Sequence, residues 1–380
     1  MDHHHTMSSQ QSKSWPSKHR TNYKQVAKKD IEALVSSGLS DLVNNPLDFL
    51  LDVHYWQWRY FESPVTAASL LQSYLPESSL MVAVCAERVI GKVGNLLMPF
   101  CVAGKSVIIP LMEGLSFSSG SRSWSRLRTL LALSYQKRQQ FNSEFSFAVT
   151  PRSSFDLYQR LGCRVVGQLP VYTGIISGND FARLRGVPFP LSLTGWCVHP
   201  LFGVRYRKDP AAGITIRRID HFGPEFDQIW NTIGPQRCVA VNKNTGYLNW
   251  RYARHPGQWY DILAAYRDGQ PDGLIVFRMV SAMKRAYVLE LIAARDDAKT
   301  MGALLDSALK HMKAEGMASV TASCLNGSPV QPLFKAAGLS PLPTRFWDMH
   351  LIVEIAENHS SGPVENLAAW ELSLGDWLLH

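Results

Sequence analysis

A short motif that occurs twice is the sequence feature that most constrains the fold of this chain. The heptapeptide WRYFESP at residues 58–64 returns as WRYARHP at residues 250–256, with the shared pattern W-R-Y-x-x-x-P. Farther along, LYQRLGC at 157–163 and LFKAAGL at 333–339 occupy matching places near the ends of the two halves. Because a long-period internal repeat indicates one structural unit used more than once, we expect two copies of one α/β unit.

The composition is typical of a globular protein with two cores. A length of 380 residues favours two domains, and 46% of the residues are hydrophobic. No stretch of about 18 apolar residues is present, and the N-terminus has no apolar signal region. We therefore expect neither a membrane span nor a secretory signal, and we predict a cytoplasmic protein.

The charge of the chain and the positions of its cysteines limit which partners, metal sites and disulfides we expect. The formal net charge is +8, and part of the excess lies in residues 1–29. Such a basic segment is most often a solvated arm, although it can also contact nucleic acid or anionic lipid. The six cysteines form no C-x-x-C pair, which argues against a zinc site or a disulfide scaffold and favours buried thiols. These cysteines are Cys85, Cys101, Cys163, Cys197, Cys238 and Cys324.

Apolar periodicity predicts the same order of elements in both halves. In the first half we expect a strand at 23–26, helices at 30–43 and 47–60, strands at 80–85, 89–99 and 106–117, a helix at 124–141, a strand at 145–149, a helix at 153–161 and a final strand at 165–172. In the second half we expect a strand at 215–219, helices at 222–233 and 247–254, strands at 261–266, 273–280 and 285–292, a helix at 300–315, a strand at 319–324, a helix at 330–337 and a final strand at 345–353.

These elements predict five regions along the chain. They are a disordered basic tail at 1–21, an N-terminal domain at 22–178, a packed connector at 179–213, a C-terminal domain at 214–355 and a C-terminal tail at 356–380. The connector is too apolar for a free linker. The C-terminal tail is expected to dock through Trp370, Trp377 and Leu378.

The order β-α-α-β-β-β-α-β-α-β over residues 23–353 resembles the GNAT superfamily of N-acetyltransferases. The doubled form is similar to two-domain GNAT proteins and to the Fem-type aminoacyl and peptidyl transferases. The resemblance implies an α/β (α+β) fold of two tandem GNAT-like domains, each a mixed, mostly antiparallel sheet flanked by helices. It also implies acetyl-CoA or another acyl-CoA as cosubstrate, and no metal.

The first motif of the family is the loop that binds the CoA diphosphate, R/Q-x-x-G-x-G/A, at the start of the long helix. Backbone N–H groups at a helix N-terminus bind phosphate oxygens, and small residues permit close approach. The resemblance places Arg122 on the motif's arginine and Ser125 on its first glycine, whereas Leu127 replaces the second. Small residues precede the helix at Ser118, Ser119, Gly120 and Ser121. These positions are the predicted cofactor-binding residues.

In the second half the same alignment gives Asp296, Lys299 and Met301. An acid in place of the arginine would repel phosphate, so we expect cofactor binding in the first unit. Tyr158 matches the family tyrosine that protonates the departing CoA thiolate, whereas Phe334 stands at that position in the second unit. The alternative for Tyr158 is a packed, half-buried aromatic side chain.

A general base is also required, and the family often uses a glutamate at or near the fourth strand. Glu113 stands there in the first unit and Glu290 in the second. Burial would raise the pKa of such a carboxyl group into a useful range. The alternative is a glutamate that is solvated or ion-paired. The repeated Trp-Arg-Tyr triplets favour a structural role, with the aromatic rings in the core and the arginine on a helix terminus or a carboxylate.

The leading hypothesis is an acyl-CoA-dependent N-acyltransferase with the acceptor, a primary amine of a small molecule or sugar, between the units. Backbone N–H groups of a strand would polarise the thioester carbonyl. A second hypothesis is Fem-type transfer from charged tRNA, which the basic charge balance suits. A third is a degenerate, non-enzymatic binding or scaffold protein.

Overall fold

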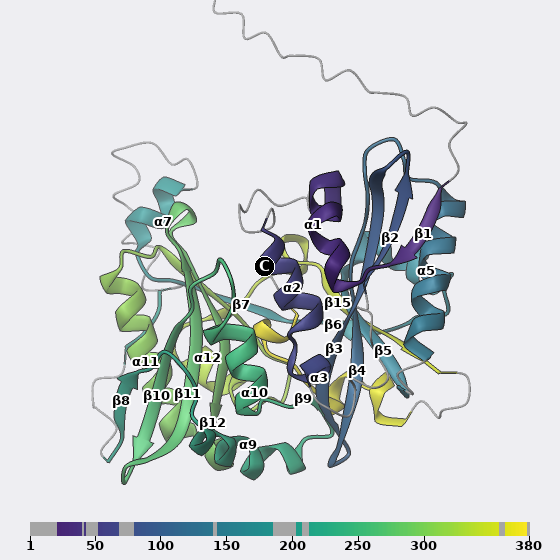
Figure 1. Cartoon of the computed structure of the whole chain (residues 1–380). Coiled ribbons are helices and arrows are strands. Elements are labelled where there is room, and N and C mark those ends of the chain that lie inside the picture. The colour runs from purple at the N-terminus through teal and green to yellow at the C-terminus, as the bar shows by residue number, and fades with distance from the viewer. Residues whose placement is uncertain are drawn as a thin grey trace, which may run out of the picture.

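Two β-sheets stand side by side in the computed structural model (Figure 1). The structure describes residues 21–39, 42, 52–67, 80–139, 143–184, 203–206, 213–356 and 362–377. Most strand pairs are antiparallel, and helices pack on the sheets, which confirms the predicted α/β class with two GNAT-like units. Within the described residues, no helix is long and apolar enough to cross a membrane.

The first sheet is built mainly from the N-terminal half. Its strands follow the order β1 (Asn22–Gln25), β2 (Leu80–Cys85), β3 (Arg88–Val102), β4 (Lys105–Phe117), β5 (Phe145–Pro151), β15 (Met349–Ile355) and β6 (Arg164–Gln168). Two short strands, β9 (Val239–Val241) and β16 (Trp370–Glu371), extend it from β3. The described helices of this unit are α1 (Ile31–Leu34), α2 (Val53–Phe61), α3 (Pro64–Ala67), α5 (Trp124–Gln139) and α6 (Phe155–Gln159).

The alternation of side chains along β2 explains why helices cover both faces of the first sheet. Successive strand residues point to opposite faces. Met81 packs with Leu127 and Leu130 of α5, whereas Leu80 and Val82 belong to the cluster that contains the α1 and α2 side chains. Both faces of β2 are therefore buried, in agreement with its continuous run of apolar residues.

The second sheet follows the order β14 (Ser340–Pro341), β7 (Val171–Ile175), β13 (Ser319–Ser323), β12 (Arg285–Ala293), β11 (Gln270–Val280), β10 (Asp261–Arg267) and β8 (Thr215–Arg218). The helices of this part are α7 (Gly178–Leu184), α9 (Asp227–Ile233), α10 (Thr245–Leu248), α11 (Ala298–Ala314) and α12 (Gln331–Ala336), and a π-helical turn at Asn249–Ala253 continues α10. The long helix α11 packs on one face of this sheet through a separate apolar cluster.

The two units exchange strands, which the sequence did not indicate. We predicted one strand at 165–172 in the first unit and one at 345–353 in the second. The first prediction is wrong, because the chain breaks after Gln168 and resumes at Val171 as β7, inside the second sheet. The second is corrected as well, since β15 lies between β5 and β6 of the first sheet. Pro170 at the break has no N–H to donate, so it suits the point where the chain leaves one sheet.

Other predicted elements changed in length or lie outside the described residues. Over the described residues 28–39, the helix predicted at 30–43 is a series of short helical turns, Lys28–Asp30, Ile31–Leu34 and Val35–Leu39, and β9 was not predicted. The basic tail at 1–20 and most of the connector at 179–213 lie outside the described residues, as does Leu378. Trp370 and Trp377 are buried, which confirms that the C-terminal segment docks.

The repeated motif forms the contact between the two units. The indole rings of Trp58 and Trp250 stack with centroids 5.0 Å apart and an interplanar angle of 21°. Each indole N–H donates to the backbone carbonyl of the other tryptophan, at 2.9 Å for Trp58 and 3.1 Å for Trp250. Equivalent residues thus contact each other reciprocally, as across a two-fold axis, and the structural interpretation of the motif is confirmed.

Replacing Trp250 with Ala should lower the free energy of unfolding by about 3–5 kcal/mol, because a fully buried ring and a reciprocal hydrogen bond are lost. Urea denaturation followed by tryptophan fluorescence measures this change. Trp259→Ala is the matched control, since that ring is 93% exposed and its loss should cost less than about 0.5 kcal/mol. Similar midpoints for the two variants would show that the reciprocal contact does not stabilise the fold.

Candidate active site

The strands β4 and β5 diverge in the first unit and open a cavity between them. They run parallel but pair at a single position, Leu111 with Phe147. Beyond this point a cavity of about 550 Å³ lies between the strands, with α5 and α6 at its sides. Trp347, Met349 and Trp377, from the C-terminal half, also line it. This volume lies within the range of small-molecule sites.

Three predicted site residues line this cavity together: Glu113 from β4, Arg122 from the loop before α5, and Tyr158 from α6. Their convergence follows from the order of elements, since the loop after β4 and the helix after β5 meet where the strands separate. Leu127, which replaces the second glycine of the family loop, also lines the cavity. The catalytic and binding roles of these residues remain predictions.

The other predicted cofactor-binding residues lie at the start of α5 and do not line the cavity. Ser118, Ser119, Gly120 and Ser121 form a turn in which the Ser121 N–H donates to the Ser118 carbonyl at 3.1 Å, and Gly120 has a φ of +77°. The buried Ser121 hydroxyl donates to the same carbonyl at 2.8 Å. Ser125 is exposed, with its hydroxyl 3.2 Å from that of Ser123. The hydroxyl groups of Ser121 and Ser125 therefore contact neighbouring residues of the same segment.

Glu113 is an ion-paired residue in this structure. Its carboxylate accepts from Arg59, with Nε at 2.6 Å and a second contact from Nη2, and from the Tyr60 hydroxyl at 2.9 Å. Both side chains of the ion pair are buried. Burial raises the pKa of Tyr60 well above its ordinary value, and the Glu113 carboxylate raises it further. This arrangement agrees with the structural alternative set out above, and a role for Glu113 as general base remains a prediction.

Lys92 is a residue that sequence reasoning missed beside this site. It is buried on β3, and its Nζ donates to the Gly114 carbonyl at 2.9 Å and lies 5.3 Å from the Trp56 ring centroid. Burial lowers its pKa to about 8, and the neighbouring Arg59 acts in the same direction, whereas Glu113 acts against it. The signal available in the sequence was a lysine inside the apolar strand RVIGKVGNLL.

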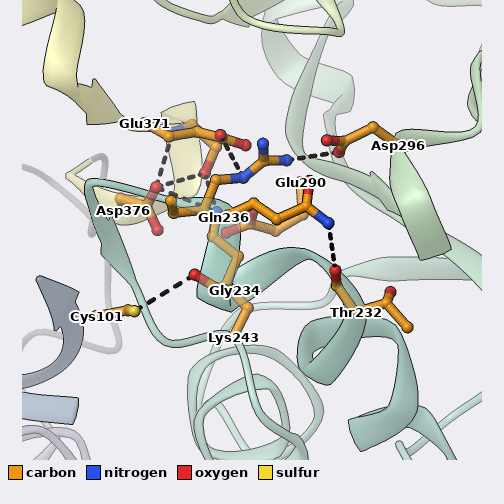
Figure 2. A network of polar contacts seen from close by, with 11 residues as sticks. Cys101, Thr232, Gly234, Gln236, Lys243, Glu290, Asp296, Glu371 and Asp376 are labelled. Atoms are coloured by element: carbon orange, nitrogen blue, oxygen red, sulfur yellow. Dashed lines mark hydrogen bonds and ion pairs between the residues drawn. The ribbon is translucent and has the colours of Figure 1, made fainter. Parts of the chain in front are cut away.

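The second unit keeps the glutamate but changes its cation. Glu290 accepts from the Tyr252 hydroxyl at 2.6 Å, as Glu113 does from Tyr60. The cation on Glu290 is Lys243, which also donates to Asp376 at 3.1 Å (Figure 2). Arg251, the arginine of the second motif, instead donates to the Gly375 carbonyl at 3.3 Å. The C-terminal segment, residues 370–377, thus takes part in the second unit's polar cluster.

The same C-terminal segment fills the place in the second unit that is open in the first. The cavity there measures about 30 Å³, and its walls combine β12 around Glu290 with Phe334 and with Leu372 and Ser373 of the C-terminal segment. This space is far smaller than the cavity of about 550 Å³ in the first unit, so a cofactor does not fit at this place. Asp296, which we expected to repel phosphate, is ion-paired with Arg237 at 2.5 Å.

Among the described residues, no group of three or more potential metal-binding side chains occurs together. No disulfide joins the described cysteines. Cys85, Cys101, Cys163 and Cys324 are buried, as expected, but Cys238 is exposed, and Cys197 lies outside the described residues. The expectation of uniformly buried thiols is therefore wrong for Cys238, which lies in the connection just before β9.

Replacing Lys243 with Met should lower the free energy of unfolding by about 3–5 kcal/mol, because two buried carboxylates lose their cation. Burial already raises the pKa of Glu290, and Lys243 opposes this shift. A group whose pKa is raised by folding contributes stability at low pH, and this contribution disappears as the pH rises through the folded-state pKa. The deficit relative to wild type should therefore widen in urea titrations as the pH rises above the ordinary glutamate pKa of about 4.3.

The exposed Lys284, which pairs with Asp180, offers the control. Lys284→Met should cost about 0–1 kcal/mol with little dependence on pH. A Lys243 variant as stable as this control would mean that the buried cluster does not hold the C-terminal segment.

No protein-family model matches this sequence, and a search of curated proteins finds no relative. Solved structures do match. A probable N-acyltransferase from Enterococcus faecalis aligns with a TM-score of 0.59 and 12% identity over 89% of this chain and 73% of its own. A GCN5-related N-acetyltransferase from Anabaena variabilis aligns with a TM-score of 0.56 and 11% identity over 88% and 73%.

The N-myristoyltransferase of Saccharomyces cerevisiae, solved with bound myristoyl-CoA, aligns with a TM-score of 0.57 and 10% identity over 90% of this chain and 84% of its own. At such identities the likeness concerns the fold. The chain therefore has the fold found in GCN5-related N-acetyltransferases.

Proposed function

We propose that this protein is an acyl-CoA-dependent N-acyltransferase that transfers an acetyl or longer acyl group to a primary amine of a small molecule or sugar. The donor would bind in the cavity of the first unit. The observation that carries this proposal is the cavity between β4 and β5, which Arg122 lines from the loop before α5 and Tyr158 from α6. The fold shared with acyltransferases supports it.

The two diverging strands suit the pantetheine arm of CoA. Backbone N–H and C=O groups require partners when they are buried, and β4 and β5 pair with each other only at Leu111 and Phe147. An extended chain that carries amide groups can hydrogen-bond to such edges as an added strand does. The exposed Arg122 and the N-terminus of α5 would then hold the diphosphate.

The chemistry follows from the groups around the cavity. The amine attacks the thioester carbonyl carbon, and a new C–N bond forms while the C–S bond breaks. Backbone N–H groups of β4 stabilise the negative charge that develops on the carbonyl oxygen. The Tyr158 hydroxyl, at 9% exposed, protonates the departing thiolate and regains a proton from solvent. The attacking amine gives up its proton to a base, for which Glu113 is the predicted residue.

Arg122→Glu should weaken acyl-CoA binding by tenfold or more, about 1.4 kcal/mol, because it places a carboxylate beside the donor's phosphates. Calorimetric titration with acetyl-CoA and longer acyl-CoAs measures this. Arg128→Glu provides a matched control, since Arg128 is an exposed arginine of α5 outside the cavity lining. Equal losses in both variants would point to a general charge effect and not to a site at Arg122.

If the wild-type protein binds no acyl-CoA, the proposed function is wrong. Salt-sensitive binding of tRNA would then support the Fem-type alternative, and binding of neither ligand would support a scaffold protein.

Tyr158→Phe should lower kcat by about 10²–10⁴-fold with little change in KM for the donor, because the ring remains but the proton donor is lost. Steady-state release of the CoA thiol with an amine acceptor measures this change. A fully active variant would assign Tyr158 to packing alone, as for Phe334 in the second unit.

A further inference from the structure

The strand β4 contains a bulge where it lines the cavity. Its register with β3 is regular up to Glu113 and resumes at Ser116. Between these points Gly114 and Leu115 face the single residue Val93. Gly114 has a φ of +62°, which a residue with a side chain rarely adopts. The bulge takes Leu115 out of the ladder with β3, and both bulge residues line the cavity.

The side chain of Lys92 holds this bulge. Its Nζ donates to the Gly114 carbonyl at 2.9 Å, and it lies 2.5 Å from the point that a Cβ of residue 114 would occupy. The peptide unit between Gly114 and Leu115 is planar and trans, so its C=O and N–H point in opposite directions. With the carbonyl directed toward Lys92, the Leu115 N–H points away from Lys92.

The second unit lacks the lysine and has its bulge on the other side of the glutamate. Gly94 pairs with Glu113 and Val276 pairs with Glu290, so the residue two positions earlier is Lys92 in one unit and Leu274 in the other. In β12 the extra residue is Leu289, before Glu290, and after Glu290 the register continues without interruption. Lys92 and a bulge that follows the glutamate therefore occur together in the first unit, beside the cavity of about 550 Å³.

We propose that Lys92 is a positioning residue that fixes the β4 bulge so that the Leu115 N–H polarises the thioester carbonyl of the bound acyl donor. This inference rests on the proposed function. Lys92 does not itself line the cavity, so it acts through the backbone of Gly114 and Leu115. Fixed donors of this kind act strongly in a cavity that excludes water, because they need no reorganisation during the reaction.

The groups around Lys92 make the proposed polarisation of the thioester carbonyl dependent on pH. The charged and titratable groups around it are Glu113 on β4 and Arg59, Tyr60 and Tyr55 on α2. Burial lowers the pKa of Lys92 to about 8, so the ammonium form is present below this pH and is lost above it. A neutral amine is a weaker donor to Gly114 than an ammonium group. Polarisation of the carbonyl should therefore decline as the pH rises through about 8.

The test compares wild type with Lys92→Met, and uses Lys105→Met, an exposed lysine at the start of β4, as the matched control. Isotope-edited infrared spectra of bound [1-¹³C]acetyl-CoA report the thioester carbonyl. We expect a lower carbonyl frequency in the wild-type complex than in free acetyl-CoA, a return toward the free value in Lys92→Met, and no change in Lys105→Met. The wild-type shift should also shrink above about pH 8, as the ammonium form is lost.

Calorimetry and kinetics separate positioning from binding. Affinity for acetyl-CoA should stay within about threefold in Lys92→Met, whereas kcat should fall by about 10–100-fold, less than the loss of an oxyanion donor itself. If Lys92→Met does not fold, Gly114→Ala provides a second route, because its methyl group would displace Nζ. An unchanged carbonyl band in a folded variant overturns the inference. Failure of the wild-type protein to bind acetyl-CoA overturns the proposed function and this inference with it.

Discussion

The reciprocal contact between Trp58 and Trp250 is the interaction on which the arrangement of the two units depends. Each indole satisfies a backbone carbonyl of the other copy and stacks on its ring, so neither motif can bury its tryptophan alone. One continuous apolar cluster extends from this contact into both sheets. The strand exchange of β7 and β15 adds backbone ladders that also join the two units. Separation of the units would expose this shared core and two sheet edges.

The Trp58–Trp250 contact holds the two copies of the motif in equivalent positions. The ion pairs that the two copies form beneath the strands have nevertheless diverged. The arginine of the first motif pairs with Glu113, whereas in the second unit Lys243 takes this role for Glu290. Arg251 is left to bind the backbone of the C-terminal segment. As a result, the space beside the glutamate measures about 550 Å³ in the first unit and about 30 Å³ at the equivalent place in the second. The C-terminal half of the chain contributes to the first cavity, because Trp347, Met349 and Trp377 also line it.

Much of the fold could be predicted because it depends on local patterns. Alternating and helical apolar spacing located most strands and helices, and the order of elements brought Glu113, Arg122 and Tyr158 to one cavity. Lys92 was missed because its partner is a backbone carbonyl on a neighbouring strand, and no spacing within the sequence reports such a bond. The role of the predicted serine-rich loop stays a prediction, and within it the Ser121 hydroxyl donates to the Ser118 carbonyl.

The sequence by itself determined that two related α/β units would form and where most of their helices and strands lie along the chain. Periodicity and repetition are properties of neighbouring residues, so they survive without knowledge of long-range contacts. Only the tertiary structure decided which sheet receives β7 and β15, because the same alternation of side chains fits either sheet. It also decided which cation binds each buried glutamate and which cavity stays open. These outcomes depend on contacts between residues that are far apart in the chain, and a linear pattern does not contain this information.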